Sequence, residues 1–202
     1  MAREIGISNI TLFPITNETA QNVVYGQAMP VKWAVSLEST INYSESAYYA
    51  DNIQEFSSKM ITGIDLSLEM SSNIDPETDA KITGKHYENG FAVTHANALP
   101  PAYAIAFEVK MDNGNLRRVV YYKTTLTREG QSNETVSDSV TAQTYTYTGK
   151  CSALQHNGAF MLMMDRAVID GLPNDQNQQD RANQAWTNFF QAPQKHDMAI
   201  AP

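Results

Sequence analysis

Two carboxylates in the stretch GIDLSLEM, residues 63–70, could be imagined as a general acid and a general base. Glycoside hydrolysis needs such a pair with its carboxyl groups about 5 to 9.5 Å apart. Asp65 and Glu69 are four residues apart on one expected strand, which separates them by roughly 13 Å at about 3.3 Å per residue. That pair is therefore excluded. A pair formed by Asp65 and Glu38 from a neighbouring strand stays open, and the plain alternative is a solvated strand face.

The other residues that could do chemistry are scattered along the chain. His86, His95, His156 and His196 form no H-E-x-x-H or H-x-x-x-H pair, so no metal site is expected. Cys151 is the only cysteine, and although His156 follows it closely, a small packed residue is the ordinary interpretation. The chain has no G-x-S-x-G elbow, P-loop or G-x-G-x-x-G sequence. We expect no catalytic residue, no metal and no cofactor, and therefore no enzyme.

The net charge of −8 is concentrated in one part of the chain. Between residues 38 and 79, nine acidic residues accompany a single base, Lys59. This balance argues against a protein that grips nucleic acid through its phosphates. The N-terminal sequence has no apolar run of signal length, and no segment approaches the roughly 18 apolar residues of a membrane-spanning helix. We expect synthesis and folding in a cytoplasm, without membrane insertion.

Alternating apolar residues predict a mainly β protein. In 63–70 the apolar positions face a core and Asp65, Ser67 and Glu69 face away from it. Alternation in 31–39 predicts a second strand with Val31, Trp33, Val35 and Leu37 inward. Residues 101–126 predict two long strands joined at Asp112–Asn115. Further strands are expected at 9–15, 86–93, 138–149 and 154–164.

Two short helices complete the expected fold. Asp75 suits an N-cap, Pro76 the first helical position and Gly84 the C-terminal end. A second helix is expected at about 175–191, with Ala182, Ala185, Trp186 and Phe189 at helical spacing. The polar, tyrosine-dotted residues 40–58 show no sustained period and are expected to be a long connection between strands. We predict one domain over 1–202, an antiparallel β-sandwich or open barrel with one or two short helices.

Several segments follow one another along the chain in a recognisable order: YYADN (48–52) with Glu55 soon after, the strand at 63–68, DPETDAKITG (75–84), the proline pair and hairpin LPPAYAIAFEVKMDNGNLRRVVYYKTTL (99–126), a threonine-rich strand closing at Gly149, and a late helix with Trp186. Together they resemble the major tail tube proteins of bacteriophages with long, non-contractile tails. The resemblance runs from about residue 45 to 190.

This resemblance implies a non-enzymatic virion protein that is made in the host bacterial cytoplasm and polymerises as stacked hexameric rings. It implies an inner sheet that forms the lumen wall and a loop that reaches the adjacent ring. In this chain that loop would be 40–58, with inter-ring candidates Tyr43, Glu45, Tyr48, Tyr49, Asp51 and Glu55. The implied partners are other copies of the chain, a tape-measure protein, tail terminator and distal tail or baseplate proteins, and double-stranded DNA in passage without specific binding.

An acidic and polar strand face would suit such a lumen, because it would not trap the phosphates of a DNA duplex. The lumen-facing candidates are Glu38, Asp65, Ser67, Glu69, Glu108 and Lys110. We also expect 40–58 and the C-terminal residues 192–202 to be mobile in a free monomer. The alternative function is a carbohydrate-binding β-sandwich of a virion or cell surface that uses Tyr43, Tyr48 and Tyr49.

Overall fold

The computed structural model describes residues 2–50, 53–71, 74–130, 144–172 and 176–194, and for 48–50, 53–56 and 176 it describes the backbone alone. Along the chain the elements are β1 (Glu4–Glu18), β2 (Val23–Tyr25), β3 (Met29–Pro30), β4 (Ala34–Ala50), β5 (Ile53–Met70), α1 (Pro76–Thr83), β6 (His86–Glu88), β7 (Phe91–Val93), β8 (Ala102–Met111), β9 (Leu116–Arg128), β10 (Tyr145–Cys151), β11 (Met161–Asp165), α2 (Arg166–Asp170) and α3 (Gln176–Thr187). The expected mainly β fold with few, short helices is confirmed.

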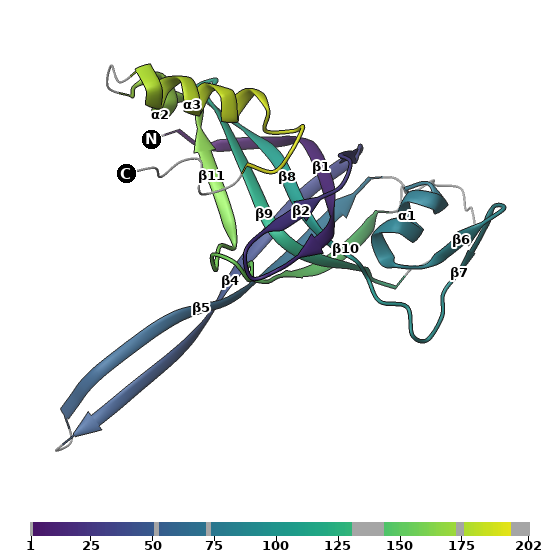
Figure 1. Ribbon diagram of the computed structural model, residues 1–202, viewed down its shortest axis with the longest axis horizontal. Helices are drawn as coiled ribbons and strands as arrows, with labels where there is room; N and C mark the ends of the chain where they lie inside the picture. Colours follow the sequence, from purple (N-terminus) through teal and green to yellow (C-terminus); the bar gives the residue numbers. More distant parts are fainter. Residues whose placement is uncertain (1, 51–52, 72–73, 131–143, 173–175, 195–202) are drawn as a thin grey trace, which may run out of the picture.

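One antiparallel sheet organises the described part of the chain, with strand order β2-β1-β8-β9-β10-β5-β4. The first half of β9 pairs with β11 and its second half pairs with β10, while β3 pairs with β1. The sheet curls without closing into a barrel, so β4 remains an edge strand (Figure 1). A separate hairpin, β6–β7, lies beside α1.

Strand β8 explains how the sheet is buried on both faces. Its large residues Tyr103, Ile105 and Phe107 belong to one core cluster, together with the inward face of β5. Its alanines, Ala104 and Ala106, belong to a second cluster that includes Phe189 from the segment after α3. Small side chains on that face leave room for the C-terminal segment to approach the sheet closely. The alternation of large and small residues in β8 therefore places one cluster inside the curl and the other under the C-terminal segment.

Helix α1 has the ends that the sequence predicts. The Asp75 carboxylate accepts a hydrogen bond from the Thr78 amide at 2.9 Å, and Pro76 begins the helix. Gly84 ends it with φ of 74°, and a Cβ there would lie 2.3 Å from the Leu99 carbonyl oxygen. Only glycine fits this left-handed C-terminal position beside a neighbouring backbone.

The C-terminal helical segment differs from the expectation in detail. Helix α3 ends at Thr187, before the expected 191, and a short helix α2 precedes it. Arg118 on β9 fixes the segment, because its guanidinium lies 4.1 Å from the centre of the Trp186 ring and donates to the Trp186 carbonyl. None of the described helices is both long and apolar enough to cross a membrane.

The predicted strand at 31–39 is wrong in its start, because β4 begins at Ala34, and in the facing of Trp33 and Val35, whereas Val31 and Leu37 contact the core as expected. Val31 is buried as expected, but Trp33 is 70% exposed with φ of 70°, and Val35 is exposed. The register shifts between Ala34 and Ser36, so one extra residue interrupts the alternation. A bulge of this kind reverses the alternation, so that Ala34 before it and Leu37 after it both pack against the core.

The expected connection at 40–58 is also corrected. Its described residues belong to β4 and β5, which form one long hairpin with residues 51–52 outside the described ranges. The register shifts again between Asn42 and Tyr43, which removes the regular period from the sequence.

Of the C-terminal residues 192–202, which are expected to be mobile in a free monomer, residues 195–202 lie outside the described ranges. Gln194 is buried, and its carbonyl accepts a 2.8 Å hydrogen bond from the Tyr122 hydroxyl.

Candidate assembly surfaces

The alternation in β5 divides the strand into a core side and a polar side. The core side is fully buried and consists of Ile64, Leu66, Leu68 and Met70. On the other side Asp65 is exposed, and Ser67 and Glu69 are half-buried. The sequence prediction for this strand is therefore confirmed at every position from 64 to 70.

The polar side of β5 continues across its neighbours in register. Directly opposite residues on antiparallel strands share a face of the sheet. One row across four strands consists of Thr40, Asp65, Lys150 and Thr125. The next row consists of Glu38, Ser67, Thr148 and Thr127. Together these eight residues, with Glu69, form what we call the polar face.

The charges of the polar face are more balanced than the sequence suggested. Lys150 lies opposite Asp65, and the Asn42 amide donates a 2.7 Å hydrogen bond to the Asp65 carboxylate. The Ser36 hydroxyl lies 3.4 Å from a Glu69 carboxylate oxygen. Three carboxylates and one ammonium group thus lie among threonines. Sequence reasoning missed Lys150 and the threonines, although the alternation in YTYTGK was the available signal.

Two of the predicted lumen residues lie elsewhere. Glu108 is 7% exposed and forms a 2.8 Å ion pair with Arg118 beneath the C-terminal segment. Lys110 is exposed near the β8–β9 turn. It is eight residues along β8 from Ala102, the residue that extends the Asp65 row, and therefore roughly 26 Å away at about 3.3 Å per residue. The structure brings together Glu38, Asp65, Ser67 and Glu69 but neither Glu108 nor Lys110.

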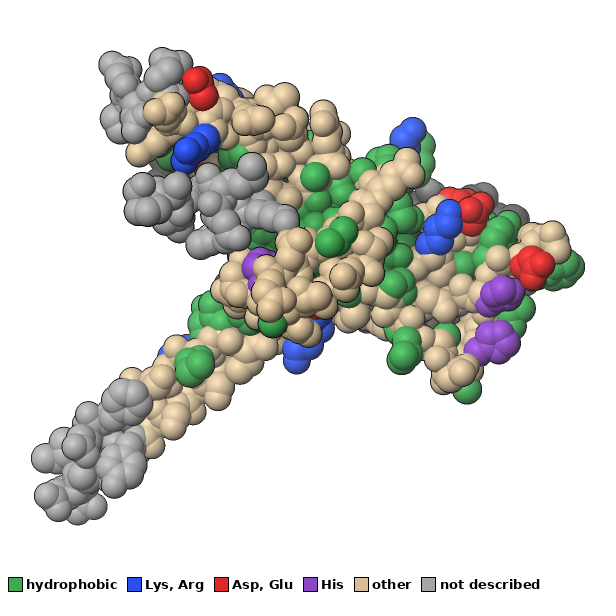
Figure 2. Space-filling view, in the orientation of Figure 1, with side chains coloured by type: hydrophobic (Ala, Val, Ile, Leu, Met, Phe, Trp, Pro, Cys, Tyr) green, Lys and Arg blue, Asp and Glu red, His purple; other side chains and the backbone are tan. Residues whose placement is uncertain are grey.

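The hairpin formed by β4 and β5 extends beyond the sheet. Strand β10 pairs with β5 only over 64–70, so residues 42–50 and 53–63 form a two-stranded ribbon without neighbours among the described strands. We call these residues the arm. It projects from the body as a narrow extension (Figure 1, Figure 2).

The arm exposes both apolar and charged side chains. Tyr43, Met60 and Ile61 are exposed, and the Lys59 ammonium lies 4.8 Å from the centre of the Tyr43 ring. Glu45 is exposed opposite Lys59. Of the other inter-ring candidates, the side chains of Tyr48, Tyr49, Asp51 and Glu55 lie outside the described residues. The arm therefore offers aromatic, aliphatic and acidic contacts.

The residues considered for catalysis lie on β10 and on the polar face. Burial raises the pKa of the Cys151 thiol, which stays protonated near neutral pH, and its sulfur lies 3.4 Å from the Phe160 carbonyl oxygen. Glu38 is a diagonal neighbour of Asp65 on an open strand face. Across the ranges that the structure describes, no three His, Cys, Asp or Glu side chains gather where a metal ion could be held.

No protein-family model matches this chain. No curated protein matches its sequence. Among solved structures it is similar to the anti-feeding prophage cap, described as the AFP tube terminating cap, with a TM-score of 0.42 and 9% identity over 77% of this chain and 87% of that chain. A similarity this remote supports no argument about function.

Proposed function

We propose that this chain is a structural subunit of a phage-type tail tube, which it builds by assembling with copies of itself into stacked rings. The observation that carries the proposal is the arm. An isolated two-stranded hairpin is marginally stable in water. A hairpin that also exposes Tyr43, Met60 and Ile61 is expected to bind a partner surface. Contact with a copy in an adjacent ring supplies one, as the sequence resemblance implies.

Ring closure would use the open edges of the sheet. The outer edge of β4 pairs with no strand in the described part of the chain. Exposed strand edges readily pair with another chain, and natural monomers usually protect them. A neighbouring copy that pairs along β4 would extend the sheet from subunit to subunit. Six copies, the number that the resemblance implies, would then close one continuous wall.

The polar face would line that wall. A DNA duplex carries one charge per roughly 1.7 Å, so a conduit has to avoid basic rings that hold phosphates. On the polar face the only base is Lys150, with Asp65 opposite it and Glu38 and Glu69 on the same face. Threonine hydroxyls between them offer weak, evenly spread contacts. Such a surface lets a duplex pass without specific binding.

The remaining partners follow from this assignment. The bore would surround a tape-measure protein during assembly, and the two ends of the tube would meet terminator and distal tail proteins. The chain would be found in the virion after assembly in the bacterial cytoplasm. These partners come from the sequence resemblance.

Sedimentation velocity over a range of concentrations tests the proposal against the carbohydrate-binding alternative. We expect discrete ring-sized species and longer polymers that appear as concentration rises. A chain that stays monomeric at high concentration and binds a glycan through Tyr43 would contradict the proposal. Removal of the arm is expected to leave rings and abolish longer polymers.

A further inference from the structure

Trp33 is held in a conformation that presents its indole to solvent. Its φ of 70° lies in the left-handed region, which bulky residues rarely adopt. The Ser71 amide and hydroxyl donate to the Trp33 carbonyl at 2.8 and 3.2 Å and fix this conformation. The side chain is nevertheless 70% exposed. A strained backbone that displays an exposed tryptophan points to an interaction site.

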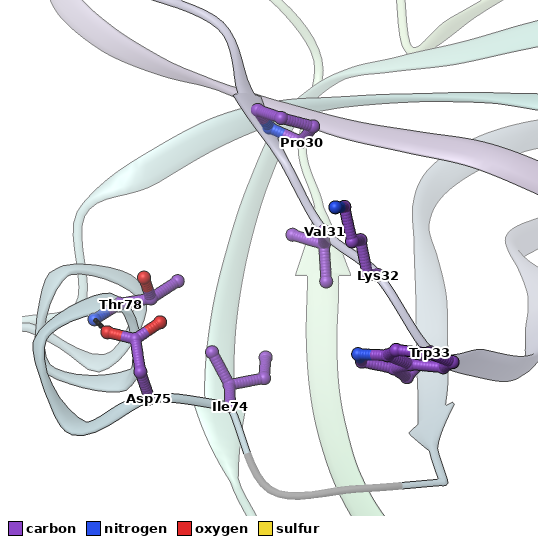
Figure 3. A pocket seen from close by; sticks show the side chains of 7 residues that line it. All are labelled: Pro30, Val31, Lys32, Trp33, Ile74, Asp75 and Thr78. Carbon is purple, nitrogen blue, oxygen red and sulfur yellow. Dashed lines mark hydrogen bonds between the residues drawn. The ribbon is translucent and has the colours of Figure 1, made fainter.

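Two hollows lie on either side of the segment 30–33. One is lined by that segment together with Ile74, Asp75 and Thr78 at the start of α1 (Figure 3). The other is lined by the segment together with residues 7–11 of β1, Ala34 and Phe190. We call the two hollows and the segment between them the Trp33 surface.

The hollow of the Trp33 surface beside β1 has Lys32 as its charged lining residue, whereas the hollow beside α1 is lined by both Lys32 and the Asp75 carboxylate. The Lys32 side chain is exposed and makes no ion pair within the described ranges. The Asp75 carboxylate already accepts the Thr78 amide as the helix cap. The surface thus combines an exposed indole, apolar walls from Val31 and Ile74, and one available ammonium group.

The arm complements the Trp33 surface in its charge and in its exposed apolar side chains. Its sequence carries Glu45, Asp51 and Glu55 against a single base, Lys59. Its described side chains include the exposed Met60 and Ile61. An acidic, partly apolar ribbon is complementary to the hollow beside β1, where the charged lining residue is Lys32 and most of the other lining residues are apolar.

The positions of the two surfaces favour contact between copies. Trp33 immediately precedes β4, and the arm is the far part of the same strand. The 17 residues of β4 extend roughly 56 Å at about 3.3 Å per residue. Helix α1, which lines the Trp33 surface, and the arm accordingly lie at opposite ends of the molecule (Figure 1). Donor and acceptor at opposite ends produce a head-to-tail contact, which repeats into an open polymer.

We propose that the Trp33 surface is the acceptor for the arm of a second copy in the next ring; this inference rests on the proposed function. Lys32 would pair with an arm carboxylate while the Trp33 indole covers the apolar side chains of the arm. Each subunit would then donate an arm at one end and receive an arm at the other.

Complementation between two variants tests the proposal. The acceptor variant is Lys32→Glu with Trp33→Gly, because glycine adopts the left-handed backbone without strain. The donor variant replaces residues 43–62 with Asn-Gly, which forms a two-residue hairpin turn. The control, Lys110→Glu with Phe91→Ala, makes the same charge change and removes another exposed aromatic ring. Circular dichroism verifies that each variant is folded, and electron microscopy counts rings and tubes.

We expect each of the two variants alone to form rings without tubes, and their mixture to form pairs of rings, since one intact arm meets one intact acceptor. The control should form tubes like the parent chain. Lys32→Glu alone should weaken stacking less than the double change, which should weaken it about thirtyfold, as loss of a tryptophan hot spot does.

The outcomes separate this inference from the proposed function. If the donor variant stays in rings while the acceptor variant forms tubes, the arm stacks on another surface and the inference is wrong. If the control loses tubes as fully as the acceptor variant, the Trp33 surface has no specific role. If the donor variant forms tubes, the proposed role of the arm itself is wrong.

Discussion

The Tyr147 hydroxyl donates a 2.6 Å hydrogen bond to the carboxylate of Asp79, which joins β10 to α1. The same carboxylate accepts from Lys85 at 2.8 Å and lies 3.5 Å from the Arg128 guanidinium. Asp79 is buried, so this network attaches α1 to the sheet at the end that carries the Trp33 surface. The acceptor for the arm therefore depends on a buried ionic contact.

The free energy of unfolding should fall in acid because the Asp79 carboxylate becomes protonated. Burial alone would raise its pKa, but hydrogen bonds from Lys85 and Tyr147 outweigh this effect and lower the pKa below its ordinary value. A carboxyl whose pKa is lower in the folded state stabilises the fold above its unfolded pKa, and this contribution is lost as pH falls through the folded pKa. With an unfolded pKa of about 3.9, the loss occurs below about pH 4. In urea titrations from pH 2 to 7, Asp79→Asn should be less stable at neutral pH and should lose less stability in acid. An unchanged acid dependence would contradict this role.

Tyr147→Phe isolates the same contact without changing a charge. Loss of a hydrogen bond to a buried carboxylate should cost about 1.5–3 kcal/mol of unfolding free energy. The matched control is Tyr121→Phe, since Tyr121 is a buried tyrosine of the same core cluster whose hydroxyl bonds to the Ser39 side chain instead of a buried carboxylate. Urea denaturation measures the unfolding free energy of both variants. An equal loss would show that the hydrogen bond to Asp79 stabilises the fold no more than the hydroxyl of another buried tyrosine does.

Glu108 should support the fold and have no part in conduction. Glu108→Ala leaves the guanidinium of Arg118 without its ion pair beneath Trp186, which should cost about 3–5 kcal/mol, as for other broken buried pairs. Glu77→Ala, which removes an exposed pair with Lys81, should change stability little. Thermal denaturation tests the contrast. Near-equal effects of the two substitutions would mean that Glu108 is not buried in solution.

Gly149 should be required where β10 meets β9. A Cβ at this position would lie 2.5 Å from the Thr125 carbonyl oxygen and 2.7 Å from Leu126. Gly149→Ala should therefore force the two strands apart and cost about 1–3 kcal/mol. Gly6→Ala is the control, because no atom outside its own chain neighbours lies within 4 Å of that Cβ. Comparable stability of both variants would contradict the close approach of β9 and β10.

The charge of the polar face should control the passage of DNA. Asp65→Lys with Glu69→Lys should leave the subunit folded, since Asp65 is exposed and the half-buried Glu69 lies on the same side of β5, away from the core. Assembled particles should release DNA more slowly, and the delay should shrink as salt rises, because phosphate contacts weaken with salt. The control Glu88→Lys with Asp170→Lys makes the same charge change away from the polar face. Normal release from the first variant, without salt dependence, would show that these residues do not line the path.

The sequence predicts those elements whose signals are local. The alternation in 63–70, the turn of the β8–β9 hairpin and the caps of α1 each depend on neighbouring residues, and the structure confirms all three. The sequence around the arm carries no comparable local signal for strands. Register shifts beside Val35 and Tyr43 interrupt the alternation of apolar and polar residues, which conceals the two long strands β4 and β5. The polar face depends on register between strands far apart in the chain. For that reason Lys150 was missed and Glu108 was placed wrongly.

Cryo-electron microscopy of the assembled particle tests the central claim most directly. We predict a tube of stacked rings in which Asp65, Ser67 and Lys150 face the axis and each arm lies against the Trp33 surface of the adjacent ring. A particle in which the polar face points outward, or one in which the arms contact nothing in the next ring, would contradict the account.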